Sequence, residues 1–98
     1  MKHIKDGEYS VTEQRRALDG MAYVYRLILH TERKYSTIGL PLYSIEIEMH
    51  EIDTGKRWNA KTRELFSEGN KAKAFFDKLV RNLATPIDLA YIVEDEFA

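Results

Sequence analysis

The segment from Tyr43 to Ile52 constrains the fold more than any other part of the chain. Apolar Tyr43, Ile45, Ile47 and Met49 alternate there with polar Ser44, Glu46, Glu48 and His50. This period of two is typical of a β-strand with one face buried and the other in water. Asp53-Thr54-Gly55 follows and predicts a tight hairpin, with glycine where the loop needs a positive φ. The rest of the chain must therefore supply a strand partner and a layer that covers the apolar face.

Three more strands are predicted around this one. Glu8 to Arg16 alternates weakly, and Leu18-Asp19-Gly20 then predicts a turn. Met21 to Thr31 is rich in β-branched and aromatic residues. Glu32 to Leu42 contains serine, glycine and proline and is predicted to be a loop, and a more polar strand lies within Arg57 to Phe66. Together these segments predict a four-stranded, mainly antiparallel meander.

Two helices are predicted after the strands. Ser67 is a suitable N-cap for the first, and apolar residues then recur at spacings of three and four until the helix ends near Ala84. In Thr85-Pro86-Ile87-Asp88-Leu89, threonine fits an N-cap, proline fits the first helical position, and Asp88 favours the positive helix end. We therefore interpret this motif as the start of a second helix and not as a site. The residues of that helix expected to be buried are Ile87, Leu89, Ala90, Ile92, Val93 and Phe97, with Tyr91 near the edge.

The predicted fold is a two-layer α+β domain over residues 1–98, with strands in about 8–66 and two C-terminal helices in about 68–97 packed on one face of the sheet. With 44% hydrophobic residues, the chain can build a core without a metal or disulfides. The predicted core consists of Tyr25, Leu27, Leu29, Ile45, Ile47, Phe75, Phe76, Leu79, Val80 and Leu83.

The composition argues against several classes of function. The absence of cysteine excludes disulfides, thiolate zinc sites and cysteine nucleophiles, and the net charge of −1 gives no global attraction to nucleic acid or membranes. The five glycines are scattered and form no phosphate-binding loop, no serine lies in a nucleophile-elbow motif, and the three histidines lack metal-ligand spacing. We expect no catalytic residue, no metal and no cofactor, and hence no enzyme. The sequence also has no export signal or membrane-spanning run, so a cytoplasmic protein is expected.

The second face of the Met21 to Thr31 strand suggests an interaction surface. If its odd positions face the helices, Val24 and Ile28 point to the other side, where a two-layer domain leaves them in water, with Arg26 between them. Tyr35 and Ile38 of the following loop could cover them, or a second copy of the chain or another protein could do so. Our leading hypothesis is a non-enzymatic protein–protein interaction or regulatory module, which could form a homodimer through the exposed side or an edge of the sheet.

A basic stretch supports an alternative function. Between Thr54 and Arg81 there are eight basic residues and three acidic ones. Positive charge beside an aromatic ring is typical of nucleic-acid binding, so a nucleic-acid accessory protein is the alternative. The acids near the C-terminus could neutralise this charge, which argues against it. The surface would consist of Arg57, Trp58, Lys61, Arg63, Lys71, Lys78 and Arg81.

The C-terminal third resembles a known family. Residues 75–97, with the sequence FFDKLVRNLATPIDLAYIVEDEF, are similar to the C-terminal signature of a family of small uncharacterised bacterial proteins. This family is a domain of unknown function that is seen mainly in anaerobic Gram-positive bacteria. The resemblance rests on Thr85-Pro86, Leu89 and Val93-Glu94-Asp95, and covers residues 67–97. That family has no assigned activity, so the resemblance implies no catalytic or binding residue.

Overall fold

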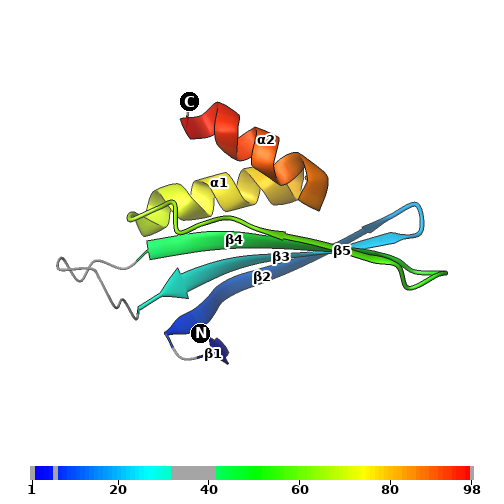
Figure 1. Cartoon of the computed structure of the whole chain (residues 1–98), viewed down its shortest axis with the longest axis horizontal. Coiled ribbons are helices and arrows are strands. Elements are labelled where there is room, and N and C mark those ends of the chain that lie inside the picture. Colours follow the sequence, from blue (N-terminus) through cyan, green and yellow to red (C-terminus); the bar gives the residue numbers. More distant parts are fainter. Residues whose placement is uncertain (1, 6, 32–41, 98) are drawn as a thin grey trace.

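The computed structural model describes residues 2–5, 7–31 and 42–97. The described part forms a five-stranded antiparallel sheet in chain order, β1-β2-β3-β4-β5, and two C-terminal helices that lie on one side of it (Figure 1). We call this face of the sheet the helix side and the other face the open side. The elements are β1 Lys2–Lys5, β2 Glu8–Leu18, β3 Met21–His30, β4 Leu42–Glu51, β5 Arg57–Lys61, α1 Gly69–Arg81 and α2 Pro86–Phe97.

The α+β prediction, with its antiparallel sheet and two C-terminal helices, is confirmed, but the prediction of four strands is wrong. The additional strand is β1, which pairs with β2 through His3 and Tyr9. Its sequence, Lys-His-Ile-Lys, has a single apolar residue and therefore no recognisable alternation. Backbone pairing with β2, and not burial of its own side chains, accounts for this strand.

Both hairpins form where glycine and aspartate allow a positive φ. Asp19 and Gly20 have φ values of 50° and 79° and connect Leu18 directly to Met21, so β2 extends past the predicted end at Arg16. Gly55 has a φ of 74°, and its N–H donates to the Glu51 carbonyl at 2.8 Å, as the Asp53-Thr54-Gly55 motif predicts. Figure 1 shows both hairpins extending beyond the helices.

The core lies between the helices and the central strands. Helix α1 packs on β3 and β4, and α2 packs on β4 and β5. Seven of the ten predicted core residues are buried there: Tyr25, Leu27, Ile45, Ile47, Phe75, Phe76 and Leu79. Val80 and Leu83 are partly buried against this core, and Leu29 is only half-buried. We conclude that two patterns identified the buried face of each element. These are the alternation of residues in β3 and β4 and the spacing of apolar residues by three and four in α1.

Helix α1 begins and ends differently from the prediction. Its N-cap is Glu68 and not Ser67, and no side chain caps the helix. At its end, the N–H of Leu83 donates to Val80 O at 3.2 Å and that of Ala84 to Leu79 O at 3.0 Å. These two bonds form a Schellman turn, in which Leu83 takes the left-handed position with a φ of 54°.

Helix α2 begins as the sequence predicts. The Thr85 hydroxyl accepts a hydrogen bond from the Asp88 N–H at 3.2 Å, while the Asp88 carboxylate accepts one from the Thr85 hydroxyl at 2.8 Å. The same carboxylate accepts from the Thr85 N–H at 3.4 Å, which completes a reciprocal cap. The fully buried Tyr25 of β3 donates its hydroxyl to the Ala84 carbonyl at 2.7 Å. The turn that orients α2 is thereby attached to the centre of the sheet.

Candidate interaction surface

The centre of the open side is a network of charged side chains around Arg26 of β3. Its Nε donates to Glu13 of β2 at 2.9 Å, and its Nη1 donates to Glu46 and Glu48 of β4 at 2.9 and 2.8 Å. The antiparallel register places Arg26 directly opposite both Glu13 and Glu46. One guanidinium therefore connects three neighbouring strands.

The pKa values in this network follow from its geometry. Burial opposes the charge of Arg26, but hydrogen bonds to Glu48, Glu46 and Glu13 raise the pKa of its guanidinium. Burial also opposes the charge of Glu13, yet hydrogen bonds from Arg26 and Arg15 lower the pKa of its carboxyl. The ionised forms thus stabilise each other. The carboxylates and the guanidinium thus form one hydrogen-bonded cluster across three strands.

Val24 and Ile28 lie on the open side, but the expectation that water reaches them there is wrong. Their side chains are only 8% and 2% exposed in the single chain. Arg26 lies between them on the same face, and its bonds to β2 and β4 hold long charged side chains across this part of the sheet. A second chain is therefore not needed to cover these two residues. Tyr35 and Ile38, the other residues of the predicted surface, lie outside the described residues.

The predicted basic surface is divided between the two sides of the sheet. The Lys61 ammonium lies 2.9 Å from the Glu8 carboxylate on the open side, and Arg57 shares that face of β5. Trp58 points to the helix side, where it packs against the core, with the Lys56 ammonium 5.4 Å from its ring. The stacking partner expected beside Arg57 and Lys61 is thus on the opposite face.

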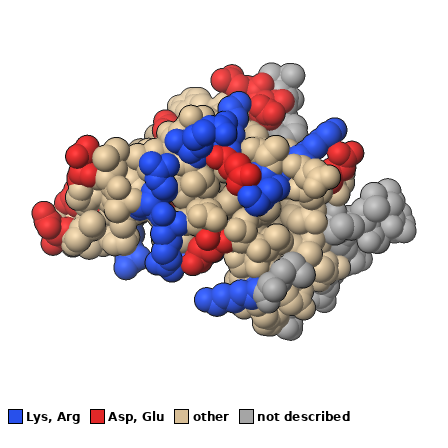
Figure 2. Space-filling view, turned by 180° about the vertical axis from the view of Figure 1, so that it is seen from behind, with Lys and Arg blue, Asp and Glu red and all other residues tan. Residues whose placement is uncertain are grey.

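The predicted surface also includes three basic residues of α1, Lys71, Lys78 and Arg81, which lie on the helix side, and two of these three have acidic neighbours. Lys71 is 3.6 Å from Glu68, and Lys78 is 3.9 Å from Glu96 of α2. Figure 2 shows basic and acidic side chains interspersed on the face that it presents, and not one field of positive charge. The seven residues of the predicted nucleic-acid surface therefore do not form one continuous patch.

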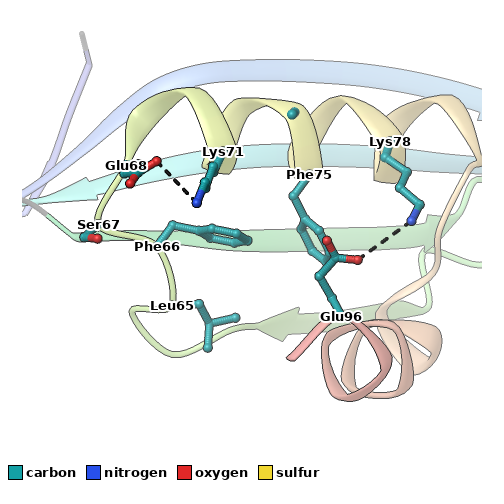
Figure 3. A pocket seen from close by; sticks show the side chains of 9 residues that line it. Leu65, Phe66, Ser67, Glu68, Lys71, Phe75, Lys78 and Glu96 are labelled. Atoms are coloured by element: carbon teal, nitrogen blue, oxygen red, sulfur yellow. Dashed lines mark ion pairs between the residues drawn. The ribbon is translucent and has the colours of Figure 1, made fainter. Parts of the chain in front are cut away.

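A groove of about 460 Å³ lies between α1, the end of α2 and residues 65–68 (Figure 3). Phe66 and Phe75 form its apolar floor, with ring centroids 5.4 Å apart. Figure 3 shows the two charged pairs of its rim, Lys71 with Glu68 and Lys78 with Glu96, on either side of the rings. The charged side chains of this groove thus pair with each other at its rim. Among the described residues, its apolar floor has no converging polar groups.

The outer edge of β5 has free backbone hydrogen-bonding groups. The Glu51 N–H donates to Lys56 O and the Thr62 N–H donates to Ile45 O, each at 2.8 Å, so the even-numbered residues of this segment bond to β4. In an antiparallel ladder the backbone groups of alternate residues point the other way. Those of Arg57, Asn59 and Lys61 therefore point outward, and within the described residues they have no backbone partner.

Helix α2, which packs on β5, carries an exposed apolar stripe. Ile87 and Tyr91, one helical turn apart, are 64% and 69% exposed, so the prediction that Ile87 is buried is wrong. A groove of about 490 Å³ separates α2 from β5 and the residues after it. Its apolar lining is Ala60, Leu65, Leu89, Ala90 and Val93, and its rim includes Arg63 and Glu94.

The strongest candidate site is therefore the β5 edge together with this groove and stripe, which we call the edge surface. The sequence analysis named Arg57, Lys61 and Arg63 only for nucleic acid and missed the surface itself. The apolar residues of α2 occur all around the helix, so periodicity did not show that Ile87 and Tyr91 are left exposed. The spacing of Ile87 and Tyr91 indicates an exposed apolar stripe only once it is known that Leu89 faces the core.

Two further properties concern the described residues as a whole. They contain no group of three or more potential metal ligands. None of the helices that they form is long and apolar enough to cross a membrane.

Comparison with known proteins identifies the family. Residues 5–98 match the Family of unknown function (DUF6514). The chain belongs to DUF6514. The match extends well beyond the C-terminal residues that carried the resemblance in the sequence and includes strands β2 to β5 of this DUF6514 protein. Searches of curated proteins and of solved structures give no significant match.

Proposed function

We propose that this DUF6514 protein is a protein–protein interaction module that binds an extended segment of a partner along the free edge of β5. The observation that carries the proposal is the edge surface itself. Outward backbone groups of Arg57, Asn59 and Lys61 lie beside an apolar groove, and α2, which forms the other wall of that groove, carries an exposed apolar stripe. A strand added to a sheet edge gains affinity from backbone hydrogen bonds and specificity from pockets for alternate side chains.

Three features support this role over an enzymatic one. The groove is mainly apolar, the Arg26 network consists of paired charges, and the charges around the Phe66 and Phe75 groove are paired at its rim. Catalytic sites instead bring unpaired polar groups together in a pocket. The nucleic-acid alternative stays a hypothesis, and the division of the basic residues between two faces does not favour it.

The proposal is tested by site-specific photo-crosslinking in cells that produce the protein naturally. A photoreactive amino acid at Asn59 or Tyr91 should give a discrete adduct, whereas one at Asn70, an exposed residue of α1, should not. An adduct of twice the 11.5 kDa mass of the chain would identify a second copy as the partner. No adduct from Asn59 and Tyr91, or an equal adduct from Asn70, would refute the proposal.

A variant separates strand addition from other contacts. Asn59→Pro removes an outward N–H without removing a bond to β4, because proline is tolerated on edge strands in this orientation. The Tyr91 adduct should disappear in Asn59→Pro and persist in Asn59→Ala, which loses only the side-chain hydrogen bond to Glu46. Persistence in both variants would show that the edge backbone is not used.

A further inference from the structure

We infer that the segment bound at the edge surface is an acidic strand of a different protein, in which acidic residues alternate with small apolar ones. This inference rests on the proposed function and specifies the chemistry of the partner. Three properties of the edge surface carry it: the direction of each side chain in β5, the distribution of charge along the edge, and the lining of the groove.

The side chains of β5 present different chemistry on the two sides of the sheet. Asn59 and Lys61 face the open side, where they contact Glu46 and Glu8, and the period of two places Arg57 with them. Trp58 and Ala60 face the helix side and pack against the core. A strand paired with β5 would therefore present every second side chain to Arg57 and Lys61, and the others to the groove beneath α2.

The open side of this edge favours acidic side chains. Arg57 is exposed and has no ion-pair partner among the described residues. Arg63, just beyond β5, is likewise exposed and has none there. Cross-strand pairs of opposite charge stabilise a sheet, and like charges directly opposite each other destabilise it. Glutamate or aspartate at alternate positions of the incoming strand would satisfy these cations.

The helix side favours small apolar side chains. The groove beneath α2 has an apolar lining of alanine, leucine and valine, and its polar residues are Lys61, Thr62 and Arg63 after β5 and Glu94 on α2. A carboxylate in contact with the apolar lining would lose its hydration, and one at the α2 wall would lie near Glu94. Small apolar side chains therefore suit the groove, and acidic side chains suit the open side of the edge.

Pairing of β5 with a second copy of itself is disfavoured by the same charges. An antiparallel pair centred on Asn59 places Arg57 of each copy opposite Lys61 of the other, and one centred on Lys61 places the two Lys61 side chains opposite each other. Both arrangements juxtapose like charges at the edge. The edge therefore selects a different chain over its own copy.

The test uses two fluorescent, end-capped seven-residue peptides, one alternating valine with glutamate and the other alternating valine with lysine. Binding to the full chain is measured by fluorescence anisotropy at low salt. The glutamate peptide should bind about tenfold more tightly than the lysine peptide, since each cross-strand charge pair changes from attraction to repulsion. Arg57→Glu should weaken this preference, because Lys61 and Arg63 retain their charges, and Asn59→Pro should abolish binding of both peptides. Arg81→Glu changes the net charge equally on exposed α1 and should leave the preference unchanged.

Several outcomes would overturn the inference. Equal binding of the two peptides, or an equal loss in Arg81→Glu and Arg57→Glu, would show that the edge does not select acidic strands. A homodimer that Asn59→Pro disrupts would place a second copy at the edge, which refutes the acidic partner and leaves the proposed interaction role intact. Failure of the proposed function itself is recognised separately, by the absence of crosslinks from both Asn59 and Tyr91.

Discussion

Tyr25→Phe tests whether the hydroxyl of Tyr25 secures the turn that places α2 beside β5. The substitution retains the buried ring and removes only the 2.7 Å hydrogen bond to the Ala84 carbonyl. A buried acceptor that loses its donor costs about 1–3 kcal/mol. We therefore expect the free energy of unfolding to fall by about 1–3 kcal/mol, which would lower the melting temperature by at least several degrees in a domain of this size.

The same hydroxyl predicts a dependence of stability on pH. Burial raises the pKa of the Tyr25 hydroxyl to about 12, from its ordinary value of 10.0. Because the folded-state pKa is raised, the stabilisation is fully present below pH 10 and is lost as the pH rises through about 12. A rise of about two units corresponds to about 2–3 kcal/mol. Stability should thus fall by up to this amount over that interval in the wild type.

The assay is urea unfolding followed by circular dichroism at pH 7 and at steps between pH 9 and 12, for the wild type and Tyr25→Phe. The variant should be less stable at pH 7, and its loss of stability at high pH should be smaller than that of the wild type. Equal stability of the two proteins at pH 7 would show that the hydrogen bond contributes nothing. An identical fall in the free energy of unfolding of both proteins at high pH would show that ionisation of Tyr25 does not destabilise the fold.

Four further tests of the local structure use substitutions followed by urea unfolding. Thr85→Ala should cost about 1 kcal/mol through loss of the reciprocal cap, and Thr85→Ser should retain most of the stability; equal losses would refute the cap. Leu83→Gly should be about 1 kcal/mol more stable than Leu83→Ala, because glycine accepts the φ of 54° at lower cost; a more stable alanine variant would contradict this. Ile28→Ala should cost about 2–5 kcal/mol, and Ile87→Ala less than about 0.5 kcal/mol, because their exposed fractions are 2% and 64%; similar costs would contradict the assigned burial. Arg26→Ala should weaken the loss of stability as the pH falls below 4.5, because the lowered pKa of Glu13 stabilises the fold only above that range; an unchanged pH profile would refute the role of Arg26.

The sequence was sufficient for the parts of the fold that depend on local chemistry. Alternation in Tyr43 to Ile52 identified the buried face of β4, glycine and aspartate marked both hairpins, and Thr85 to Asp88 marked the start of α2. Arg26 and Glu46 lie directly opposite each other in the register of β3 and β4, and the arginine binds both Glu46 and Glu48. Each of these features follows from residues close in sequence or from a simple register.

The errors arose where tertiary packing decides. Ile28 is apolar on the face opposite the helices, and the sequence could not show that it would be buried within the single chain. Ile87 is apolar in an apolar helix, and only the packing of α2 on β5 shows that it is left exposed. The edge surface likewise depends on which strand is last in the sheet, a property of topology that no local pattern encodes.

Residue-resolved amide hydrogen exchange of β5, measured by NMR with and without the glutamate peptide, tests the central claim most directly. In the free chain the outward amides of Arg57, Asn59 and Lys61 should exchange faster than the inward amides of Trp58 and Ala60. Binding should slow exchange of the outward amides selectively. Slow exchange of those three amides in the free chain, or no change when the peptide binds, would contradict the claim that the edge of β5 is a free docking surface.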